Sequence, residues 1–339
     1  MHMMTAPDLT RAAHQLETTA AYRFWPETSV LGVRGDDRVS WLNGQLTNDV
    51  RSIPAGESVH ALAVNVKGKI MAEVWVSEQR EREQLLLLVP RAAEPALRES
   101  LEHFIIMEDV TLEPRPELQV LSVEGPDARR VHAELAADGC SFACDPLQLG
   151  GVVYLGSAPE LEAVAQKLQA AGVPQIAPEA YELVRLRRAR PRYGVDFDEH
   201  HYPQEAGLKA YVSFQKGCYL GQEVVCTLEN RGRLSRQLCE LLGAPEQRID
   251  VGAPLSVAKP DGSSEQTGAI TSVAWDPERN AARALGYVRR VHIKPGLEVM
   301  AGTHALTLVK LVGDDTHDTH DTHDAHDAHD AHDAPASAP

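Results

Sequence analysis

The pattern of apolar residues changes near residue 236, and this change limits the folds that the chain can adopt. Upstream, segments with the two-residue alternation of strands are interspersed with segments of helical periodicity. Downstream, short β-prone runs are separated by turn sequences such as "KPDG" (259–262) and "DPERN" (276–280), and helical periodicity is absent. This division predicts an α+β protein whose last domain, 236–312, is a compact β-barrel or sandwich.

Two segments near the N-terminus have the alternation expected of paired strands. They are "VHALAVNV" (59–66) and "IMAEVWV" (70–76), and Lys67-Gly68-Lys69 joins them. Because glycine permits a tight turn, we predict a β-hairpin here. Four apolar residues at helical spacing then predict an amphipathic helix: Leu97, Leu101, Phe104 and Ile105.

The segment from about 117 to 176 alternates between the two kinds of pattern. The order is strand ("LQVLSVEG"), helix, strand ("GVVYLG") and helix. The second helix has Ser157 as its predicted N-cap, and Gly172 is predicted to stop it. This order predicts a small two-layer subdomain of the ferredoxin-like type. We expect it to belong to a larger core domain of residues 1–235.

The charge of the chain argues against direct nucleic-acid binding. Eight of its 49 acidic residues lie from Asp314 onward, where Lys and Arg are absent. The rest of the chain has 41 acidic and 33 basic residues, and the net charge is −16 overall. The longest apolar run, Leu85 to Val89, is too short to cross a membrane, and the N-terminus lacks a signal-peptide pattern. We therefore expect a cytoplasmic protein without membrane contacts.

The C-terminal segment 313–339 is a low-complexity repeat in which histidine recurs every third residue from His317 to His332. It cannot bury a core, so we predict a disordered tail. One hypothesis is that its imidazoles and carboxylates handle a metal ion. We favour a repeat without function, because a loose repeat cannot build an ordered second shell. The five cysteines lack C-x-x-C spacing, which predicts reduced thiols and no metal site.

Five arginines are concentrated in "RLRRARPR" (185–192). They can form an ordinary solvated face of a helix or strand. They can also form an anion site, since guanidinium groups match the geometry of carboxylates and phosphates. The sequence alone leaves both interpretations open.

Cys218 lies between two glycines in "QKGCYLGQE" (215–223). Lys216 is close enough in sequence to act as a cation that lowers the pKa of a reactive thiol. Alternatively, Gly217 and Gly221 mark a turn in which Cys218 is a small buried residue. Spacing alone favours the turn.

The octamer "KGCYLGQE" resembles the signature of the YgfZ family, folate-binding relatives of the glycine-cleavage T-protein that support iron-sulfur enzymes. Further blocks resemble the same superfamily in the same order: 35–49, 61–76, 181–208 and 267–288. The resemblance covers roughly residues 25–310. It implies a three-domain ring around a folate cavity, with a ferredoxin-like unit and a C-terminal β-barrel.

The resemblance also implies functional residues. Cys218 would act as a thiolate, with Lys216 as its cation. Tetrahydrofolate or a derivative would be bound by nine residues: Asn65, Glu73, Arg185, Arg187, Tyr193, Gly217, Gly221, Gln222 and Glu223. The implied role is that of an accessory protein that sustains the assembly or repair of iron-sulfur clusters in client enzymes, including tRNA-modifying enzymes.

The chain differs from the aminomethyltransferases of this superfamily at four positions that face the cofactor. Ala72-Glu73 replaces an acidic pair, Arg187 replaces a glutamate, Gln222 replaces an arginine, and Cys218 replaces an acid. These changes argue against ordinary glycine-cleavage chemistry. A folate-dependent aminomethyltransferase, with Glu73 as its carboxylate, is the alternative function. A metal-handling protein that works through its tail is the third.

Overall fold

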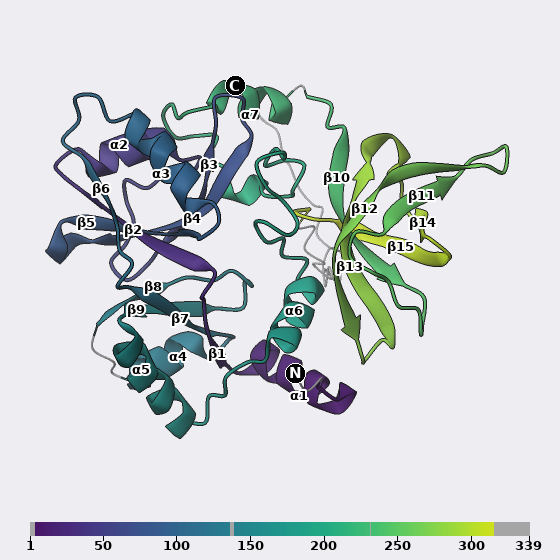
Figure 1. Ribbon diagram of the computed structural model, residues 1–339, viewed down its shortest axis with the longest axis horizontal. Helices are drawn as coiled ribbons and strands as arrows, with labels where there is room; N and C mark the ends of the chain where they lie inside the picture. Colours follow the sequence, from purple (N-terminus) through teal and green to yellow (C-terminus); the bar gives the residue numbers. More distant parts are fainter. Residues whose placement is uncertain (1–3, 136–138, 231, 315–339) are drawn as a thin grey trace, which may run out of the picture.

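The computed structural model describes residues 4–135, 139–230 and 232–314. Three β-sheets with their helices surround helix α6 (Pro178–Arg187) and the loops that follow it (Figure 1). We call the three parts the first lobe, the second lobe and the barrel. This confirms the predicted α+β ring. Of the tail predicted over 313–339, only Gly313 and Asp314 are among the described residues.

The first lobe is a five-stranded sheet in the order β3-β4-β5-β2-β6, with two helices. Its elements are β2 (Thr28–Arg34), α2 (Arg38–Gln45), β3 (Val59–Val64), β4 (Ile70–Gln79), η1 (Arg80–Arg82), β5 (Gln84–Pro90), α3 (Glu94–His103) and β6 (Thr111–Pro114). The predicted hairpin is confirmed as β3 and β4. The predicted amphipathic helix is present as α3, which buries Leu97 and Leu101, but it ends at His103, so Phe104 is its C-cap and Ile105 lies beyond it.

The second lobe is a four-stranded sheet in the order β1-β7-β9-β8, covered by two helices. Its elements are β1 (Ala21–Phe24), β7 (Gln119–Glu124), α4 (Ala128–Leu135), β8 (Cys140–Ala143), β9 (Gly151–Gly156) and α5 (Ala158–Ala170). The ferredoxin-like unit is thus present, and Ser157 begins α5 through a capping box, as predicted. Strand β1 was not predicted, because it comes from far outside the segment 117–176.

The two sheets pack face to face, which explains the apolar run in β5. Leu85 and Leu87 point into the core of the first lobe, whereas Leu86 and Leu88 contact the second lobe. Their partners there include Val153 of β9. A strand buried on both faces is continuously apolar rather than alternating.

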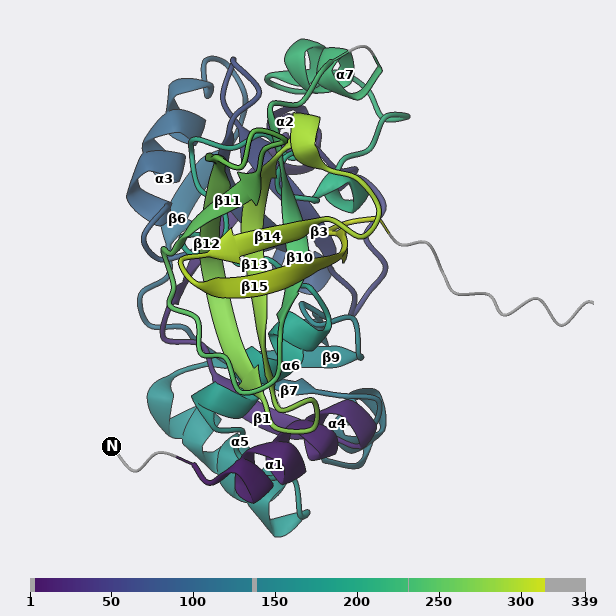
Figure 2. The ribbon, with the colours of Figure 1, turned by 90° about the vertical axis from the view of Figure 1, so that its right-hand side faces the viewer.

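The barrel is closed by six strands in the order β10-β13-β12-β11-β14-β15 (Figure 2). They are β10 (Arg236–Gly243), β11 (Pro254–Ala258), β12 (Ser264–Asp276), β13 (Ala281–Arg289), β14 (Glu298–Ala301) and β15 (His304–Leu311), with η3 (Arg290–His292) after β13. Closure leaves no free sheet edge, and inward residues such as Leu241 and Val299 form its core. The β domain predicted after residue 236 is therefore a barrel.

Helix α6 lies between the second lobe and the barrel. It packs against α1 (Ala6–Thr18) on one side and against β12 and β13 of the barrel on another (Figure 1). The chain then runs through η2 (Lys209–Tyr211) to α7 (Gln222–Asn230), which lies beside the tip of the β3–β4 hairpin. Within the described ranges, we find no helix whose length and hydropathy would let it span a membrane.

Candidate ligand-binding cavity and thiol site

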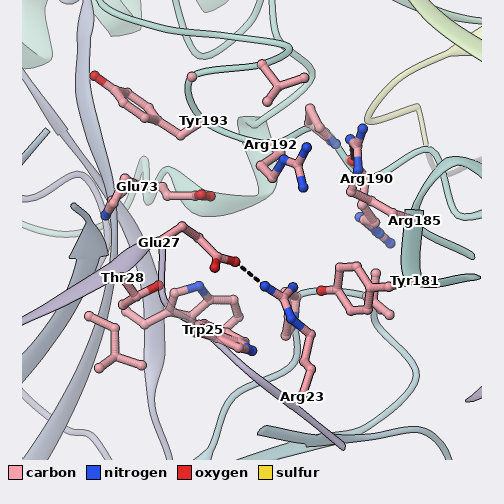
Figure 3. Close-up of a pocket in the computed structure, with 18 of the residues that line it drawn as sticks. Arg23, Trp25, Glu27, Thr28, Glu73, Tyr181, Arg185, Arg190, Arg192 and Tyr193 are labelled. Atoms are coloured by element: carbon pink, nitrogen blue, oxygen red, sulfur yellow. Dashed lines mark hydrogen bonds and ion pairs between the residues drawn. The ribbon is translucent and has the colours of Figure 1, made fainter. Parts of the chain in front are cut away.

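A cavity of about 950 Å³ lies between the first lobe, the second lobe and the loop after α6 (Figure 3). Its walls come from β1 and the turn after it, from β3 to β5, from the start of α6 and from residues 190–195. Cavities of about 300–1,000 Å³ with mostly apolar walls and a few polar groups are typical of small-molecule sites. This cavity is large enough for a cofactor.

One wall is the face of the β3–β4 hairpin that points away from the core of the first lobe. Alternation along β4 places Glu73 and Trp75 on this face, while Ala72 and Val74 point into the core. Trp75 is directly opposite His60 of β3 in the strand register. Their rings stack with centroids 4.1 Å apart.

His60 is held between two aromatic rings. The ring of Tyr211 is the second aromatic neighbour of the His60 imidazole, and the two ring centroids are 3.8 Å apart. The Nε2 atom of His60 lies 3.5 Å from Oε2 of Glu73, and neither imidazole nitrogen has a hydrogen-bond partner within the described part of the chain. The side chain is only 10% exposed. A buried polar ring without partners is costly unless a ligand or water supplies them.

The structure gives the arginines of 185–192 different roles. Arg185 is buried, and it donates hydrogen bonds to Glu182, Asp196 and Ser272. Burial alone would lower the pKa of Arg185, but the two carboxylates outweigh it and raise the pKa. Although Arg185 lines the cavity, its donors are already engaged by the protein.

Arg187, which was predicted to bind the cofactor, is not part of the cavity lining. Its guanidinium pairs with Glu17 of α1 and with Asp276 and Glu278 next to the barrel, at 2.8–2.9 Å. Arg188 also points elsewhere and donates to backbone carbonyl oxygens of the second lobe. These two arginines therefore connect parts of the fold.

Arg190 and Arg192 both line the cavity. Arg192 is 3.4 Å from a carboxylate oxygen of Glu182. Arg190 has no side-chain hydrogen bond or ion pair to any residue that the structure describes, and its Nε is buried without a partner. Figure 3 shows both guanidinium groups toward the side of the cavity that carries Arg185. This side can bind an anion.

Aromatic and charged residues that the sequence did not single out form the rest of the site. Arg23 pairs with Glu27, and its guanidinium lies 4.3 Å from the ring centroid of Tyr181 (Figure 3). The hydroxyl of Tyr181 donates a hydrogen bond at 3.3 Å to Glu124, which is not part of the cavity lining. Burial raises the pKa of Glu124, although Arg23 acts in the opposite direction. Trp25 provides an apolar surface between the charged groups.

Of the nine residues predicted to bind folate, Glu73, Arg185 and Tyr193 line the cavity. Burial raises the pKa of Tyr193 to about 12, so the phenol stays protonated. The other six do not line it: Asn65, Arg187, Gly217, Gly221, Gln222 and Glu223. Asn65 is at the hairpin tip, Gly217 and Gly221 are in the loop that carries Cys218, and Gln222 and Glu223 begin α7.

Lys216 attaches this loop to the first lobe. Its buried ammonium group donates to the carbonyl oxygens of Asn43, Leu46 and Asn48 at 2.6, 2.7 and 2.8 Å. These carbonyls lie at the C-terminal end of α2, where backbone acceptors lack helical partners and a cation is favourable. Burial lowers the pKa of Lys216 to about 8. Cys218 is exposed, so it is not the buried turn residue that spacing favoured.

The loop is also fitted against the tip of the β3–β4 hairpin. The side-chain oxygen of Asn65 accepts from the backbone N–H groups of Lys67 and Lys69 and closes the hairpin turn. Gly221 has a φ of 76°, and a Cβ at this position would lie 2.4 Å from the backbone oxygen of Asn65. Asn65 and Gly221 therefore determine the position of the loop between η2 and α7 that carries Cys218, which we call the thiol loop.

The sequence contained weak signals for the residues that were missed. His60 interrupts the apolar pattern of a strand, on the same face as Glu73 and Trp75, which indicates a polar contact on that face. Arg190 was part of the noted arginine run. Its importance became visible only when the structure assigned partners to its neighbours.

The ring of two α/β lobes and a barrel is the fold of the glycine-cleavage aminomethyltransferases. The crystal structure of aminomethyltransferase T from Bartonella henselae superimposes with a TM-score of 0.79, covering 92% of this chain and 91% of that one, at 20% sequence identity. No family model matches the chain.

In sequence, the chain is YgfZ-like. It is 27% identical to the tRNA-modifying protein YgfZ of Colwellia psychrerythraea over 235 residues, which are 65% of this chain and 71% of that protein. The tRNA-modifying protein YgfZ of Yersinia enterocolitica is 24% identical over 240 residues, 67% of this chain and 72% of that protein. The family resemblance stated from the sequence is thus confirmed.

Proposed function

We propose that this protein binds a reduced folate in its cavity and, as an accessory factor, supports the assembly or repair of iron-sulfur clusters in client enzymes that modify tRNA. Two findings support the role: the sequence similarity to proteins named tRNA-modifying protein YgfZ, and the aminomethyltransferase fold. The partner would be a client enzyme rather than the acidic tRNA itself, because the net charge of the chain is −16.

The observation that carries the folate proposal is the cavity. It combines a carboxylate, Glu73, with an arginine, Arg190, that lacks a partner among the described residues. Reduced folates have a heteroaromatic ring with N–H donors and a glutamate tail with carboxylates. The cavity offers acceptors for the donors, cations for the tail and apolar surface between them. When bound, the folate would supply one-carbon or redox chemistry, while these residues bind and orient it.

The exposed Cys218 would serve the client rather than the folate, since it does not belong to the cavity lining. An exposed thiol can approach a cluster on another protein. Lys216 attaches the loop that carries Cys218 to the first lobe through its three hydrogen bonds to carbonyl oxygens.

Calorimetric titration tests the binding step. Tetrahydrofolate should bind the purified protein, and its affinity should fall as salt rises, because the tail is held by guanidinium groups. Absence of heat, together with no competition by a folate analogue, would contradict the proposal. Dialysis against a noncoordinating buffer before titration excludes carry-over of folate from the cells.

Deletion of the gene tests the role. Activities of iron-sulfur tRNA-modifying enzymes should fall while glycine cleavage is intact; the reverse result would favour the aminomethyltransferase, for which the fold and Glu73 are the supporting features. Complementation with Cys218→Ala should fail although that variant melts like the wild type. Full complementation would remove the thiol from the proposed mechanism.

A further inference from the structure

We propose that a second cavity, between the loop after α6 and the barrel, binds a phosphate group that still carries a proton, as inorganic phosphate or as a small phosphate monoester. This inference is independent of the proposed function. The residues that carry it are Asp198, His201, Arg236 and Tyr287. All four line the second cavity, and none of them lines the cavity described above.

The second cavity has a volume of about 570 Å³. Its walls come from residues 194–201, from β12 and β13 of the barrel and from the first residue of β10. The two cavities share only Gly194 and Val195 in their linings. A volume of this size is within the range of small-molecule sites.

His201 lines the second cavity with one of its ring nitrogens fixed. Its Nδ1 lies 2.7 Å from Oδ1 of Asp198, which requires a proton on Nδ1; the backbone N–H of Asp198, at 3.2 Å, is the weaker competitor. The Nε2 atom has no hydrogen bond to any described residue, so it is left as an acceptor. Burial and the nearby Arg236 lower the pKa of His201, against the effect of Asp198 and Glu205. A ligand that binds to Nε2 must therefore bring its own proton.

Arg236 supplies the positive charge. Its Nε lies 3.6 Å from Oε2 of Glu205, and one terminal nitrogen donates to the carbonyl oxygen of His200 at 3.2 Å. The other terminal nitrogen has no hydrogen-bond partner in the described part of the chain. Because the side chain is partly exposed, its remaining N–H groups can reach an oxyanion.

Tyr287 lies against both of these groups. Its ring stacks on the imidazole of His201 with centroids 4.7 Å apart, and the guanidinium carbon of Arg236 is 4.9 Å from its centroid. Tyr287 is only 6% exposed, and its hydroxyl is buried without a hydrogen-bond partner among the described residues. A buried hydroxyl without a partner is costly, and an oxyanion can accept its proton.

The charges of the lining favour an anion. Asp196 accepts four hydrogen bonds, one of them from the buried guanidinium of Arg185, so its charge is compensated. The remaining carboxylate, Asp198, is opposed by Arg236 and Arg289, which leaves the lining with a net positive charge. Arg289 also pairs with Glu265, but an exposed pair of this kind contributes little.

The need for a proton selects phosphate among common anions. The second pKa of a phosphate group is about 6, so a protonated form is available near neutral pH. Its O–H group can donate to Nε2 of His201, while its other oxygens accept from Arg236 and Tyr287. Sulfate has the same tetrahedral shape but carries no proton, so its oxygens would face the lone pair of Nε2.

Titrations followed by ³¹P NMR test the site, with inorganic phosphate and with phenyl phosphate as probes and sulfate as competitor. The wild type should bind at least one of the two phosphates, and sulfate should bind about tenfold more weakly. Arg236→Gln and Tyr287→Phe should each lower the phosphate affinity, Arg236→Gln by about tenfold or more. Arg190→Gln, the same substitution in the first cavity, is the control and should leave it unchanged. His201→Gln, whose amide offers N–H donors, should remove the preference for phosphate over sulfate.

Three results would overturn the proposal. They are the absence of binding by both phosphates, equal affinities of the wild type for phosphate and sulfate, and a loss of binding in Arg190→Gln but not in Arg236→Gln or Tyr287→Phe. Arg236→Gln also loses its contact with Glu205, so its melting curve is measured first. If that variant does not fold, Tyr287→Phe decides, because it removes a hydroxyl that has no partner within the described chain.

Discussion

Burial distinguishes the thiol of Cys218 from those of Cys140 and Cys144. Cys218 is exposed, whereas burial raises the pKa of Cys140 and, more strongly, that of Cys144, where nearby carboxylates act in the same direction. The thiolate is the reactive form. We expect iodoacetamide near neutral pH to modify Cys218 well before the other two, as followed by peptide mass spectrometry. Equal rates for Cys218 and Cys144 would contradict this.

Lys216 is predicted to matter for stability rather than for thiol reactivity. Lys216→Met removes three hydrogen bonds from a charged donor and leaves carbonyl oxygens buried without partners. We expect a loss of about 2–3 kcal/mol in the free energy of unfolding. Denaturant unfolding measures it, and Lys67→Met, at the exposed hairpin turn, is the control that should change little.

The same side chain gives a pH dependence with a defined sign. Burial lowers the pKa of Lys216 to about 8 in the folded protein, from 10.5. Between these values the unfolded chain binds more protons, so the stability of the wild type should rise with pH. Relative to Lys216→Met, the stability advantage of the wild type should therefore grow from pH 8 to pH 10. A constant difference would show that the ammonium keeps its proton on its carbonyl ligands.

At the scale of elements, the thiol loop depends on two glycines of different importance. A Cβ at Gly221 would collide with the backbone of Asn65, and its φ of 76° is unfavourable for other residues. A Cβ at Gly217 would meet nothing within 4 Å. Gly221→Ala should therefore destabilise the protein by at least about 1–2 kcal/mol, and Gly217→Ala should leave the melting temperature unchanged. Thermal melts of both variants compare them directly.

The elements that sequence analysis predicted are those with local signals. The β3–β4 hairpin has its glycine turn, α3 has its apolar spacing, and α5 has its capping box. Strand β1 has only four residues, and it pairs with β7 about a hundred positions later. Such a strand owes its existence to a distant partner, so no local pattern could reveal it.

At the scale of the whole molecule, Arg187 connects α1, α6 and the barrel. Its partner Asp276 is almost completely buried and is shared with Arg283. Arg187→Gln should lower the free energy of unfolding by about 2–4 kcal/mol, somewhat less than the loss of an unshared buried pair. Arg129→Gln breaks an exposed pair with Glu57 and should cost under about 1 kcal/mol. Similar losses in the two variants, measured by denaturant unfolding, would contradict a special role for Arg187.

This connection also explains which site residues the sequence could predict. Glu73 was expected at the cofactor from the family resemblance, and local alternation places it on the face of β4 opposite to Ala72 and Val74. Arg187 and Arg190 are three residues apart in one run and look equivalent in sequence. Asp276, 89 residues after Arg187, pairs with Arg187 and leaves Arg190 in the cavity. Long-range pairing of this kind cannot be inferred from spacing.

Strand β1 pairs with β7, which comes about a hundred residues later in the sequence. This separation has a consequence for the order in which the chain folds during its synthesis. Ala21 pairs with Glu124, and the entire first lobe, from β2 to β6, lies between them in sequence. At about 5–20 residues per second, β1 is synthesised roughly 5–20 s before β7. The first lobe can therefore complete its sheet while β1 is still unpaired. The second lobe closes only afterwards, by capturing a strand that was synthesised before the lobe it belongs to.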